Sequence, residues 1–439
     1  MKKIICLLLV IVIGVSFSGC SKTQTANIYD SNGDGIVHVD SLVDFAGYNA
    51  TYLDIAVNEA AGIIAAIKDC EIDSAKKRLK NYNIYTYLNP TAAAYMADAY
   101  NKNVRGTNFG CAMTDLNGKL IAAYSAGNDT TQNFATQKMQ QHSTIKPLAV
   151  YAPAIESGII NWSTLTKDSP YKVLTNSKGV KYDWPSNANH QYTYEDITVY
   201  KALKQSVNTI AVKILSQYGV NNSMNFLQSK LGIDVKAEQY KANIYGEDEV
   251  IGNIALGATQ AGSTPIDMAG YYQIFANGGK YTPPTAISRI EDRSGNVIYK
   301  DEQKTSQVIS AETSYIMNEL LRGVTKSSGT GGEAYVEGVQ ISGKTGTGDA
   351  NVDNWFVGIT PEFSCAVWHS NFDHLNHAAK IFSDITRGIG VENKLFATSP
   401  NVTKCIYCAQ SGMLLGNGCK KAEMGYYLKE NSPKDCTLH

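Results

Sequence analysis

The sequence lacks an excess of charge of either sign, because 39 lysines and arginines face 40 aspartates and glutamates among 439 residues. A polyelectrolyte partner such as nucleic acid is therefore not expected. The chain also has no internal repeat and no long low-complexity tract, and 44% of its residues are hydrophobic, which is typical of an ordinary folded protein. Its length suits one large domain with appendages, or two to three average domains.

A long apolar run is also missing at the N-terminus. The run Ile4 to Val15 is too short for a confident membrane span. It follows Met1-Lys-Lys and is followed by Ser18-Gly19-Cys20, which is the pattern of a lipoprotein export signal. We expect a signal peptide over residues 1–19, a lipid on Cys20, and a mature chain on the extracytoplasmic face of the cell membrane. An ordinary buried helix is the alternative interpretation.

Cysteine is sparse in most of the chain and concentrated at its end. In an exported chain the four tail cysteines predict disulfides that hold a small C-terminal region, with three pairings open. A zinc site is the alternative, although thiolate sites suit a reducing compartment better. The tail cysteines are Cys405, Cys408, Cys419 and Cys436, and the cysteines left as buried residues or free thiols are Cys70, Cys111 and Cys365.

The pattern of elements predicts four regions. They are the signal peptide 1–19, an N-terminal linker or small helical region 20–80, a large domain 81–400, and a cysteine-rich tail 401–439. In the second region, Asp30 to His38 resembles the start of a calcium loop. Ser41 stands where the bidentate glutamate should be, so we favour a solvated turn there and leave calcium binding open.

Strands are expected early and late in the large domain. "NYNIYTYL" reads as a strand, and Asn117-Gly118 predicts a hairpin turn between two more. The last two strands flank Thr360-Pro361. We therefore expect one mixed sheet whose first and last strands meet, covered by helices. Helices are predicted around residues 51–68, 143–158, 195–217, 222–231, 264–277 and 310–323.

The segment "GVQISGKTGTG", residues 338–348, permits two interpretations. It matches the phosphate-binding loop of nucleotide hydrolases, and from Lys344 it is the K-T-G element of serine acyl-transferases. A phosphate loop follows a buried strand and opens a helix. Here "GGEAYVEG" precedes the segment and "GTGDANVDNWFVG" follows it, so neither flank fits. The K-T-G interpretation is favoured.

A nucleophile motif S-x-x-K should precede such a K-T-G strand. Ser143-Thr-Ile-Lys146 is the candidate, although Ser74 to Lys77 and Ser169 to Lys172 also match. Pro147 is tolerated only near a helix start, so we expect the helix to begin close to Ser143. The Ser143 N–H would then be unpaired and able to form half of an oxyanion hole, with Lys146 lying against the hydroxyl.

A lysine acts as a base only when it is neutral. The pKa of Lys146 must therefore be lowered by burial and by a second positive charge, for which Lys344 is the candidate. Ser206-Val-Asn208 supplies the remaining element, a hydroxyl for proton relay and an amide for the substrate. Each motif is weak alone, and their common order makes the combination specific.

These residues and their surroundings resemble the penicillin-binding transpeptidases, most closely the transpeptidase domain of class A penicillin-binding proteins. The resemblance covers roughly residues 80–400 and includes "STIKP", "YAPAIESG", "SVN", "ALGATQAGSTPIDMAGYYQIFANGGKYTPP" and "GKTGTGDANVDNWFVGITP". The tail, with "CAQSG" and a terminal C-x-x-H, also looks like tails in that family. The resemblance implies an α+β fold shared with serine β-lactamases, with a mostly antiparallel sheet flanked by helices.

The resemblance also implies roles for the motif residues. Ser143 would attack the penultimate carbonyl of a D-Ala-D-Ala stem peptide, Lys146 would be its base, and Ser206 would pass the proton to the leaving amine. Asn208 would bind a substrate amide, and Lys344 would complete the polar network. The hydroxyls of Thr345 and Thr347 would bind the terminal carboxylate, and the Thr347 N–H would be the second oxyanion donor. Gly346 fits the close approach of a substrate strand.

The chain departs from the family pattern at particular points. His142 stands where the family commonly has glycine, and it is the first candidate for crowding the site. No intact glycosyltransferase domain is present in the sequence, so glycan polymerisation is not expected. A D,D-transpeptidase that also binds β-lactams is the favoured function, and a separate glycan polymerase is a candidate partner. A D,D-carboxypeptidase, a β-lactamase, or a non-catalytic sensor or scaffold are the alternatives; neither a cofactor nor a catalytic metal is expected.

Overall fold

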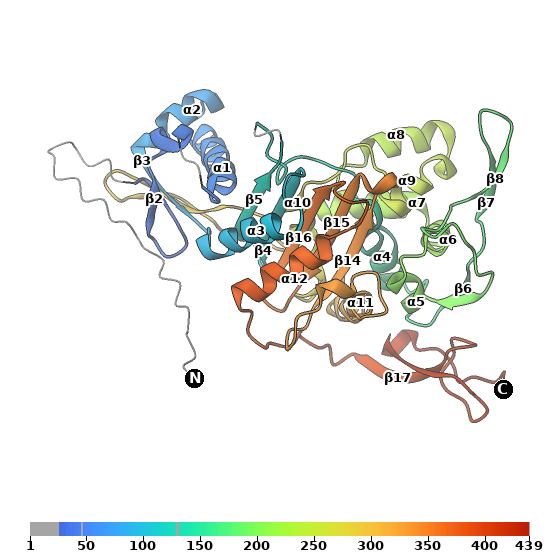
Figure 1. The fold of residues 1–439 in the computed structure, drawn as a ribbon. Helices are drawn as coiled ribbons and strands as arrows, with labels where there is room; N and C mark the ends of the chain where they lie inside the picture. Colours follow the sequence, from blue (N-terminus) through green and yellow to red (C-terminus); the bar gives the residue numbers. More distant parts are fainter. Residues whose placement is uncertain (1–25, 45–46, 129–130, 439) are drawn as a thin grey trace, which may run out of the picture.

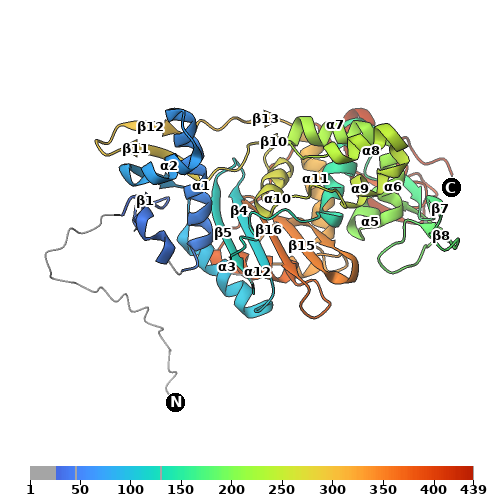
Figure 2. The ribbon, with the colours of Figure 1, turned by 90° about the horizontal axis from the view of Figure 1, so that it is seen from above.

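A computed structural model describes residues 26–44, 47–128 and 131–438 of the chain (Figure 1). The predicted signal peptide and Cys20 lie outside these residues, as does His439. The described residues form a small N-terminal unit, a central sheet with helices on both faces, and a C-terminal hairpin (Figures 1 and 2).

The central sheet has the strand order β14-β15-β16-β4-β5, and every neighbouring pair is antiparallel. The early and late strands meet, as the sequence predicted, because β16 pairs with β4. The prediction of a mixed sheet was wrong, since no parallel pair occurs in this sheet. The strands are β4 (Phe109–Asp115), β5 (Leu120–Ala126), β14 (Ser342–Thr347), β15 (Asp353–Ile359) and β16 (Phe363–Ser370).

Alternate residues of the sheet face two separate hydrophobic cores. Trp355 and Val357 belong to one core, and Phe356 between them belongs to the other, as the two-residue period of a strand requires. Helices α3 (Pro90–Asn103) and α12 (Ala378–Ile389) cover the Phe356 face, while α10 (Pro265–Tyr272) and α11 (Ala311–Val324) pack on the other. The candidate site lies on the α10 and α11 side.

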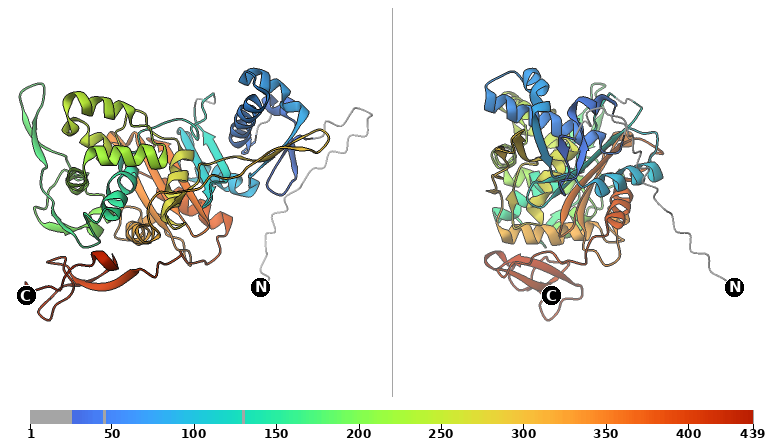
Figure 3. Two further views of the ribbon diagram at one scale, coloured as in Figure 1. Left: turned by 180° about the vertical axis from the view of Figure 1, so that it is seen from behind. Right: turned by 90° about the vertical axis from the view of Figure 1, so that its left-hand side faces the viewer.

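A lobe of shorter elements extends from that face. A thin hairpin, β7–β8, projects from the lobe at the end of the molecule away from the N-terminal unit (Figure 3). The helices of the lobe are α4 (Ala152–Glu156), α5 (Val199–Lys204), α6 (Asn208–Tyr218), α7 (Val220–Leu231), α8 (Lys236–Tyr245) and α9 (Ile251–Leu256). Its paired strands are β6 (Leu165–Lys167) with β9 (Asp196–Thr198) and β7 (Lys172–Thr175) with β8 (Lys181–Trp184), and β10 (Lys280–Tyr281) pairs with β13 (Ser306–Gln307) beside it.

The N-terminal unit is built from segments far apart in the sequence. Its sheet has the order β12-β11-β3-β1-β2, and α1 (Ala50–Lys68) and α2 (Ile72–Arg78) belong to the same unit. The predicted region 20–80 supplies β1, β2, α1 and α2 to this unit, and the predicted region 81–400 supplies β3, β11 and β12. Its strands are β1 (Ile28–Tyr29), β2 (Gly35–Val37), β3 (Tyr82–Thr86), β11 (Ile287–Asp292) and β12 (Val297–Lys300).

The calcium-like segment forms the turn between β1 and β2. The Asp30 carboxylate accepts the backbone N–H groups of Asn32 and Asp34 at 2.8 and 3.0 Å, and Gly33 has a φ of +86°. Strands, not helices, flank this turn. The prediction of a turn in place of a helix-loop-helix is confirmed.

One helix in the described part of the chain, α1, is long and apolar enough to cross a membrane by length and composition alone. Its Tyr52, Leu53 and Ala56 are fully buried. The Tyr52 hydroxyl donates to the carbonyl oxygens of Leu120 in β5 and Ala286 before β11, at 2.7 and 3.1 Å. Helix α1 therefore serves as a core helix between the N-terminal unit and the central sheet.

The tail folds as a hairpin of β17 (Val402–Cys408) and β18 (Ala422–Leu428), beneath α11 in Figure 1. Tyr426 packs against Trp162, with ring centroids 5.1 Å apart, and also against Tyr315 of α11. The four tail cysteines are all free thiols in the structure. The tail is thus held to the body by packing and hydrogen bonds.

Candidate active site

Ser143 lies in a short turn between the central sheet and the helical lobe. The sequence predicted a regular helix from this point, but His142–Ile145 is a 3-10 turn, Pro147–Tyr151 a π-turn, and α-helix begins only at Ala152. Pro147 lacks an N–H and cannot complete a regular hydrogen-bond ladder here. The irregular start places Ser143 at the surface while Lys146 is completely buried.

The Ser143 hydroxyl is free of hydrogen bonds to the described residues. The expected direct contact with Lys146 is therefore not formed as a hydrogen bond. Catalytic hydrogen bonds often tighten only when a substrate is present. The half-buried hydroxyl is available to a ligand from the solvent side.

Lys146 donates to oxygens of the Ser206–Asn208 turn. Its Nζ lies 2.7 Å from the Ser206 carbonyl oxygen, 3.3 Å from Ser206 Oγ and 2.6 Å from Asn208 Oδ1. Three acceptors match the three N–H bonds of an ammonium group. The second motif thus holds the lysine of the first motif in a fixed position.

Lys344 approaches the same hydroxyl from the K-T-G strand. Its Nζ lies 2.8 Å from Ser206 Oγ and 2.9 Å from the Thr345 carbonyl oxygen, and its side chain is fully buried. Ser206 Oγ consequently sits between two buried lysines. The three sequence motifs meet at this one oxygen atom.

Burial of two neighbouring cations lowers the pKa of both lysines. The pKa of Lys146 falls well below 10.5, first because burial removes water from the charged form and second because Lys344 repels it. Burial alone lowers the pKa of Lys344 to about 7. A neutral lysine, and hence a base, is accessible at this site near neutral pH.

The Ser206–Asn208 turn interrupts the helix predicted over 195–217. Helix α5 ends at Lys204, Ser206 adopts a left-handed conformation with φ +57°, and α6 begins at Asn208. This conformation costs a non-glycine residue about 1 kcal/mol. The break points both Ser206 oxygens toward Lys146, which an unbroken helix would not do.

The Asn208 side chain is oriented by a neighbouring loop. Its Nδ2 donates to the Ser186 carbonyl oxygen at 2.7 Å, and its backbone N–H donates to Asn187 Oδ1 at 3.0 Å. With Nδ2 engaged in this way, Oδ1 must face Lys146. Ser186 and Asn187 carry no motif, so their part in the site was not visible in the sequence.

Strand β14 is an edge strand of the central sheet, and its free edge borders the site. The Gly348 N–H, just after β14, donates to the carbonyl oxygen of Asp353, the first residue of β15. Since backbone groups alternate in direction along an antiparallel strand, the N–H and C=O groups of Thr345 and Thr347 point away from β15. The predicted substrate strand could pair with this edge at these two threonines, although the Thr345 carbonyl oxygen also accepts from Lys344 Nζ.

Gly346 lies at a close contact within the protein itself. A Cβ there would be 3.0 Å from the Gln141 carbonyl oxygen and from Thr144 Cγ2. The sequence interpretation attributed the need for glycine to a substrate strand. The structure adds a second reason, the packing of β14 against the turn that carries Ser143.

Two further side chains hold the K-T-G strand in place. The Asn376 amide donates to the Gly346 carbonyl oxygen at 2.9 Å and to Thr347 Oγ1 at 3.1 Å. The hydroxyls of Thr330 and Thr345 are 2.8 Å apart. Sequence reasoning missed both residues, because neither lies in a recognisable motif.

His142 has a left-handed backbone with φ +48°, which explains why glycine suits this position. Its ring is turned toward β15, with Nε2 3.3 Å from the Asp353 carboxylate and close to Gly348. None of its hydrogen bonds involves Ser143, Lys146 or Ser206. Whether the ring crowds a ligand at Ser143 stays a prediction.

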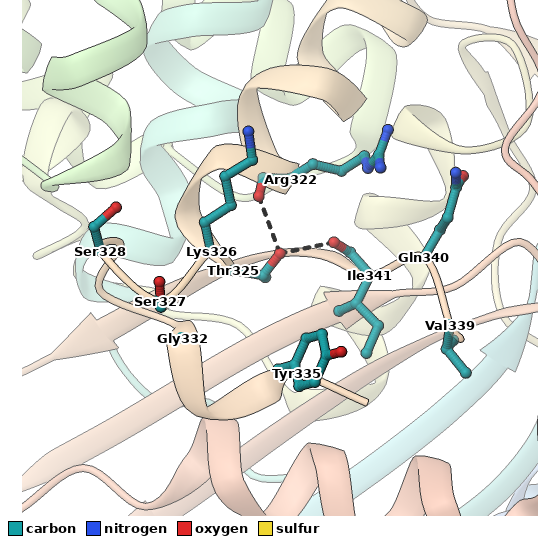
Figure 4. A pocket seen from close by; sticks show the side chains of 10 residues that line it. All are labelled: Arg322, Thr325, Lys326, Ser327, Ser328, Gly332, Tyr335, Val339, Gln340 and Ile341. Carbon is teal, nitrogen blue, oxygen red and sulfur yellow. Dashed lines mark hydrogen bonds between the residues drawn. The ribbon is translucent and has the colours of Figure 1, made fainter. Parts of the chain in front are cut away.

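A separate pocket of about 620 Å³ lies between the end of α11 and the start of β14 (Figure 4). The Thr325 hydroxyl donates to the carbonyl oxygens of Arg322 and Ile341 inside it. Ser328 at its rim bonds Lys204 and Gln205, next to the Ser206 turn. None of the motif residues lines this pocket, so it is a neighbour of the candidate site and not the site itself.

The nucleotide-binding interpretation of residues 338–348 is excluded by the local fold. Lys344 and Thr345 lie inside β14, and the next element is the single turn Asp349–Asn351 followed by β15. A phosphate loop needs a helix N-terminus at this point. The K-T-G interpretation is consistent with this strand.

Comparison with known proteins shows the family to which this chain is similar. Residues 96–387 match the family model described as the penicillin binding protein transpeptidase domain. Penicillin-binding protein 1A of Clostridium botulinum is 32% identical over 256 residues, which are 56% of this chain and 30% of the relative. Penicillin-binding protein 4 of Bacillus subtilis is 32% identical over 293 residues, or 65% of this chain and 44% of the relative. The matches thus span less than half of these relatives' length.

Solved structures agree in fold. Penicillin-binding protein 1A from Haemophilus influenzae superimposes with a TM-score of 0.61 at 21% identity, over 76% of this chain and 55% of that one. The PonA1 protein from Mycobacterium tuberculosis, in complex with penicillin V, gives a TM-score of 0.62 at 22% identity, over 80% and 96%. The α+β fold expected from the sequence is confirmed, and the chain belongs to the penicillin-binding protein transpeptidase family.

Proposed function

We propose that this chain is a serine D,D-transpeptidase that acts on the D-Ala-D-Ala stem peptides of peptidoglycan and is acylated by β-lactams at Ser143. The observation that carries the proposal is the convergence of two fully buried lysines on Ser206 Oγ; one of them, Lys146, lies three residues along the chain from Ser143, whose hydroxyl bonds none of the described residues. Buried cations without a carboxylate partner are costly for a fold. Proton transfer is a function that accounts for that cost.

In the proposed acylation step, Ser143 Oγ attacks the carbonyl of the penultimate D-Ala. The O–C bond forms and the bond from that carbonyl to the terminal D-Ala nitrogen breaks. Neutral Lys146 takes the hydroxyl proton, and Ser206 relays a proton to the leaving amine. Lys344 bonds the relay hydroxyl at 2.8 Å and keeps it oriented.

The substrate would lie along the free edge of β14. The N–H groups of Ser143 and Thr347 would bind the carbonyl oxygen as it becomes negative. The hydroxyls of Thr345 and Thr347 would receive the terminal carboxylate, and Asn208 would hold a substrate amide. Strand addition to an unpaired edge is a common mode of peptide recognition.

The second half-reaction decides between the related activities. Attack on the ester by an amine of a neighbouring stem peptide gives transpeptidation, and attack by water gives D,D-carboxypeptidase or β-lactamase activity. A non-catalytic sensor or scaffold would stop at the ester or before it. We favour the amine acceptor because the family model is that of transpeptidases.

Attachment to the membrane through a lipid on Cys20 would place the domain outside the cytoplasm, where stem peptides occur. The regions proposed around it are the signal peptide 1–19, the linker region 20–80, the transpeptidase domain 81–400 and the tail 401–439. A separate glycan polymerase would supply the strands to be cross-linked.

The test combines covalent labelling with product analysis. A fluorescent penicillin should label the wild type and the Ser74→Ala and Ser169→Ala variants, which change the other two S-x-x-K matches, but not Ser143→Ala. Lys146→Ala should label far more slowly, because an unactivated serine hydroxyl is a poor nucleophile near neutral pH. A stem peptide with an amine acceptor should yield the cross-linked product and free D-Ala by mass spectrometry.

Different failures point to different alternatives. Label at Ser74 or Ser169 would refute the assignment of the nucleophile. Release of D-Ala without cross-linking at any acceptor concentration would identify a carboxypeptidase, and rapid turnover of the penicillin ester a β-lactamase. An absence of both labelling and D-Ala release would support the sensor or scaffold function.

A further inference from the structure

The tail contains a cluster of three cysteine sulfurs that the proposed catalytic function does not use. The sulfur atoms of Cys408, Cys419 and Cys436 all lie within 4.8 Å of one another, and two of the three residues are buried. Cys405, the fourth tail cysteine, is not part of this cluster. The cluster joins the end of β17, the loop before β18 and the C-terminal segment.

Backbone pairing around Leu414 brings these three segments together. The Cys408 N–H donates to the Met413 carbonyl oxygen, and the Cys436 N–H donates to that of Leu414, each at 2.8 Å. Leu414 itself forms bridges with Tyr407 on one side and with Asp435 on the other. The three sulfurs thus converge because the backbone is ordered around them.

Two of the three sulfurs, those of Cys419 and Cys436, also receive a hydrogen bond from the protein. The Gly416 N–H donates to Cys419 Sγ at 3.3 Å, and the Ser411 hydroxyl donates to Cys436 Sγ at 3.2 Å. Donors directed at sulfur stabilise the negative thiolate, as they do around metal-bound cysteines.

A disulfide accounts for this arrangement less well. It joins two sulfurs at about 2.0 Å and leaves the third without a partner inside the cluster. Three thiolates at about 2.3 Å from a zinc ion lie about 3.8 Å from one another, which is compatible with the observed limit of 4.8 Å. The odd number of sulfurs and their mutual proximity favour a metal over a disulfide.

We propose that Cys408, Cys419 and Cys436 form a structural site for Zn²⁺ that fixes the fold of the tail. Binding replaces thiol protons, which pass to solvent, by three sulfur–zinc bonds and involves no oxidation. Three thiolates leave one tetrahedral position for a further donor.

A metal would meet a need of this region. The buried apolar residues that β17 and β18 supply to the core are few, mainly Tyr407 and Tyr427. Small elements with little core usually depend on a disulfide or a metal. Because β18 packs on α11 through Tyr426, an ordered tail also supports the helix that covers β14.

The test measures metal content and thiol state on the full chain purified from membranes in detergent. We expect about one zinc per chain in the wild type. Loss of zinc is expected in Cys408→Ser and Cys436→Ser, with retention in Cys405→Ser, the matched tail control. Replacement of zinc by Co²⁺ should give the intense near-ultraviolet absorption of thiolate coordination in the wild type and in Cys405→Ser. Ser411→Ala, which removes a donor to a sulfur, should weaken zinc affinity by about tenfold.

Two results would overturn the proposal. One is a disulfide between any two of the three cysteines in unreduced peptides of the purified wild type. The other is zinc content that is low in the wild type even after Zn²⁺ is added to reduced protein, or equal in wild type and Cys408→Ser. Neither measurement depends on transpeptidase activity, so the outcome is independent of the proposed function.

Discussion

At the scale of single residues, the site depends on the placement of two positive charges in a dry environment. Lys146 and Lys344 are both fully buried, and the described residues bonded to them offer neutral oxygens in place of carboxylates. A carboxylate would restore the lysine pKa and keep the base protonated. Neutral acceptors instead allow one lysine to lose its proton while the other keeps the polar network intact.

The influence of Lys344 on Lys146 can be measured through the pH dependence of acylation. In the proposed mechanism acylation needs neutral Lys146, so its rate should fall as the pH is lowered through the pKa of that lysine. Lys344→Met removes the repulsion that is the second cause of the lowered pKa. The pKa of Lys146 should rise, and the acid limb of the rate profile should move to higher pH.

The measurement is the rate constant for penicillin acylation as a function of pH. Lys230→Met, which changes an exposed lysine of α7, serves as the control and should leave the profile unchanged. An acid limb at the same pH in Lys344→Met and wild type would contradict the electrostatic role given to Lys344.

The same substitution should increase stability. Lys344 binds its proton less tightly when folded, with a pKa of about 7, than when unfolded, with 10.5. One pKa unit corresponds to about 1.4 kcal/mol, so the folded state loses about 4 kcal/mol at pH 7 and about 5 kcal/mol well below pH 7. Loss of two hydrogen bonds, at about 1 kcal/mol each, reduces the net gain in Lys344→Met to about 2 kcal/mol.

The sign of the pH dependence checks this account. The penalty decreases as the pH rises from 7 toward 10.5, because the unfolded chain then also loses the proton. The stability advantage of Lys344→Met should therefore shrink between pH 7 and about pH 9.5 in denaturant unfolding. An advantage independent of pH would indicate a packing effect instead.

At the scale of elements, the site depends on contact between β14 and the turn that carries Ser143. Gly346 allows this contact, because a Cβ at that position would be 3.0 Å from two atoms of the turn and 3.2 Å from Trp355 Cβ. The two proposed oxyanion donors lie on opposite sides of the contact, one on the turn and one on the strand. Their separation therefore depends on how closely the two elements pack.

Gly346→Ala should consequently impair both stability and acylation. Overpacking of this size costs about 1–3 kcal/mol, and a displaced strand would misalign the N–H groups of Ser143 and Thr347. Unfolding and penicillin labelling should be measured on the same protein. Gly62→Ala in α1 is the control, since no atom lies within 4 Å of the added Cβ. Normal labelling by Gly346→Ala would show that the contact does not position the donors.

Local sequence patterns predicted the site residues that belong to motifs. They did not predict the residues that reach the site only through contacts between segments far apart in the sequence. Ser143, Lys146 and Lys344 were proposed because their residue types recur in a known order, and the structure brings the two lysines together at Ser206 Oγ. The left-handed turn at Ser206 was missed, because helical periodicity runs through it without interruption. Asn376 and Thr330 were missed because only the folded sheet brings them to β14.

The fold shows the same division. Strand β3 was expected in the main sheet, but it pairs with β1 and with β11, which lies some 200 residues later in the sequence. Strand propensity is a local property, whereas the choice of partner strand is decided by tertiary packing. Strands β4, β5, β15 and β16 of the central sheet were predicted from the sequence. One short turn connects β4 to β5 and another connects β15 to β16, so each pair is a local hairpin.

At the scale of the whole molecule, the proposed attachment to a membrane has two candidate anchors, the lipid on Cys20 and helix α1. Helix α1 has the length and composition of a membrane span, yet seven of its residues are buried inside the protein. Removing it from the fold would expose Tyr52 and Leu53 and break the two hydrogen bonds of the Tyr52 hydroxyl. Burial of one such side chain contributes about 1.5–3 kcal/mol, so insertion of α1 into a membrane would be strongly opposed.

We therefore predict that attachment depends on Cys20 and not on α1. Cys20→Ala should release the protein from the membrane fraction or leave its precursor uncleaved, while Cys6→Ala, the control within the leader, should be processed and attached normally. A chain exported with a cleavable non-lipoprotein leader and beginning at residue 26 retains α1 and should appear entirely in the soluble fraction, with penicillin labelling at Ser143 unchanged. If that chain stayed with the membrane through a wash in high salt, α1 or another apolar surface would be the anchor, and the role assigned to Cys20 would be wrong.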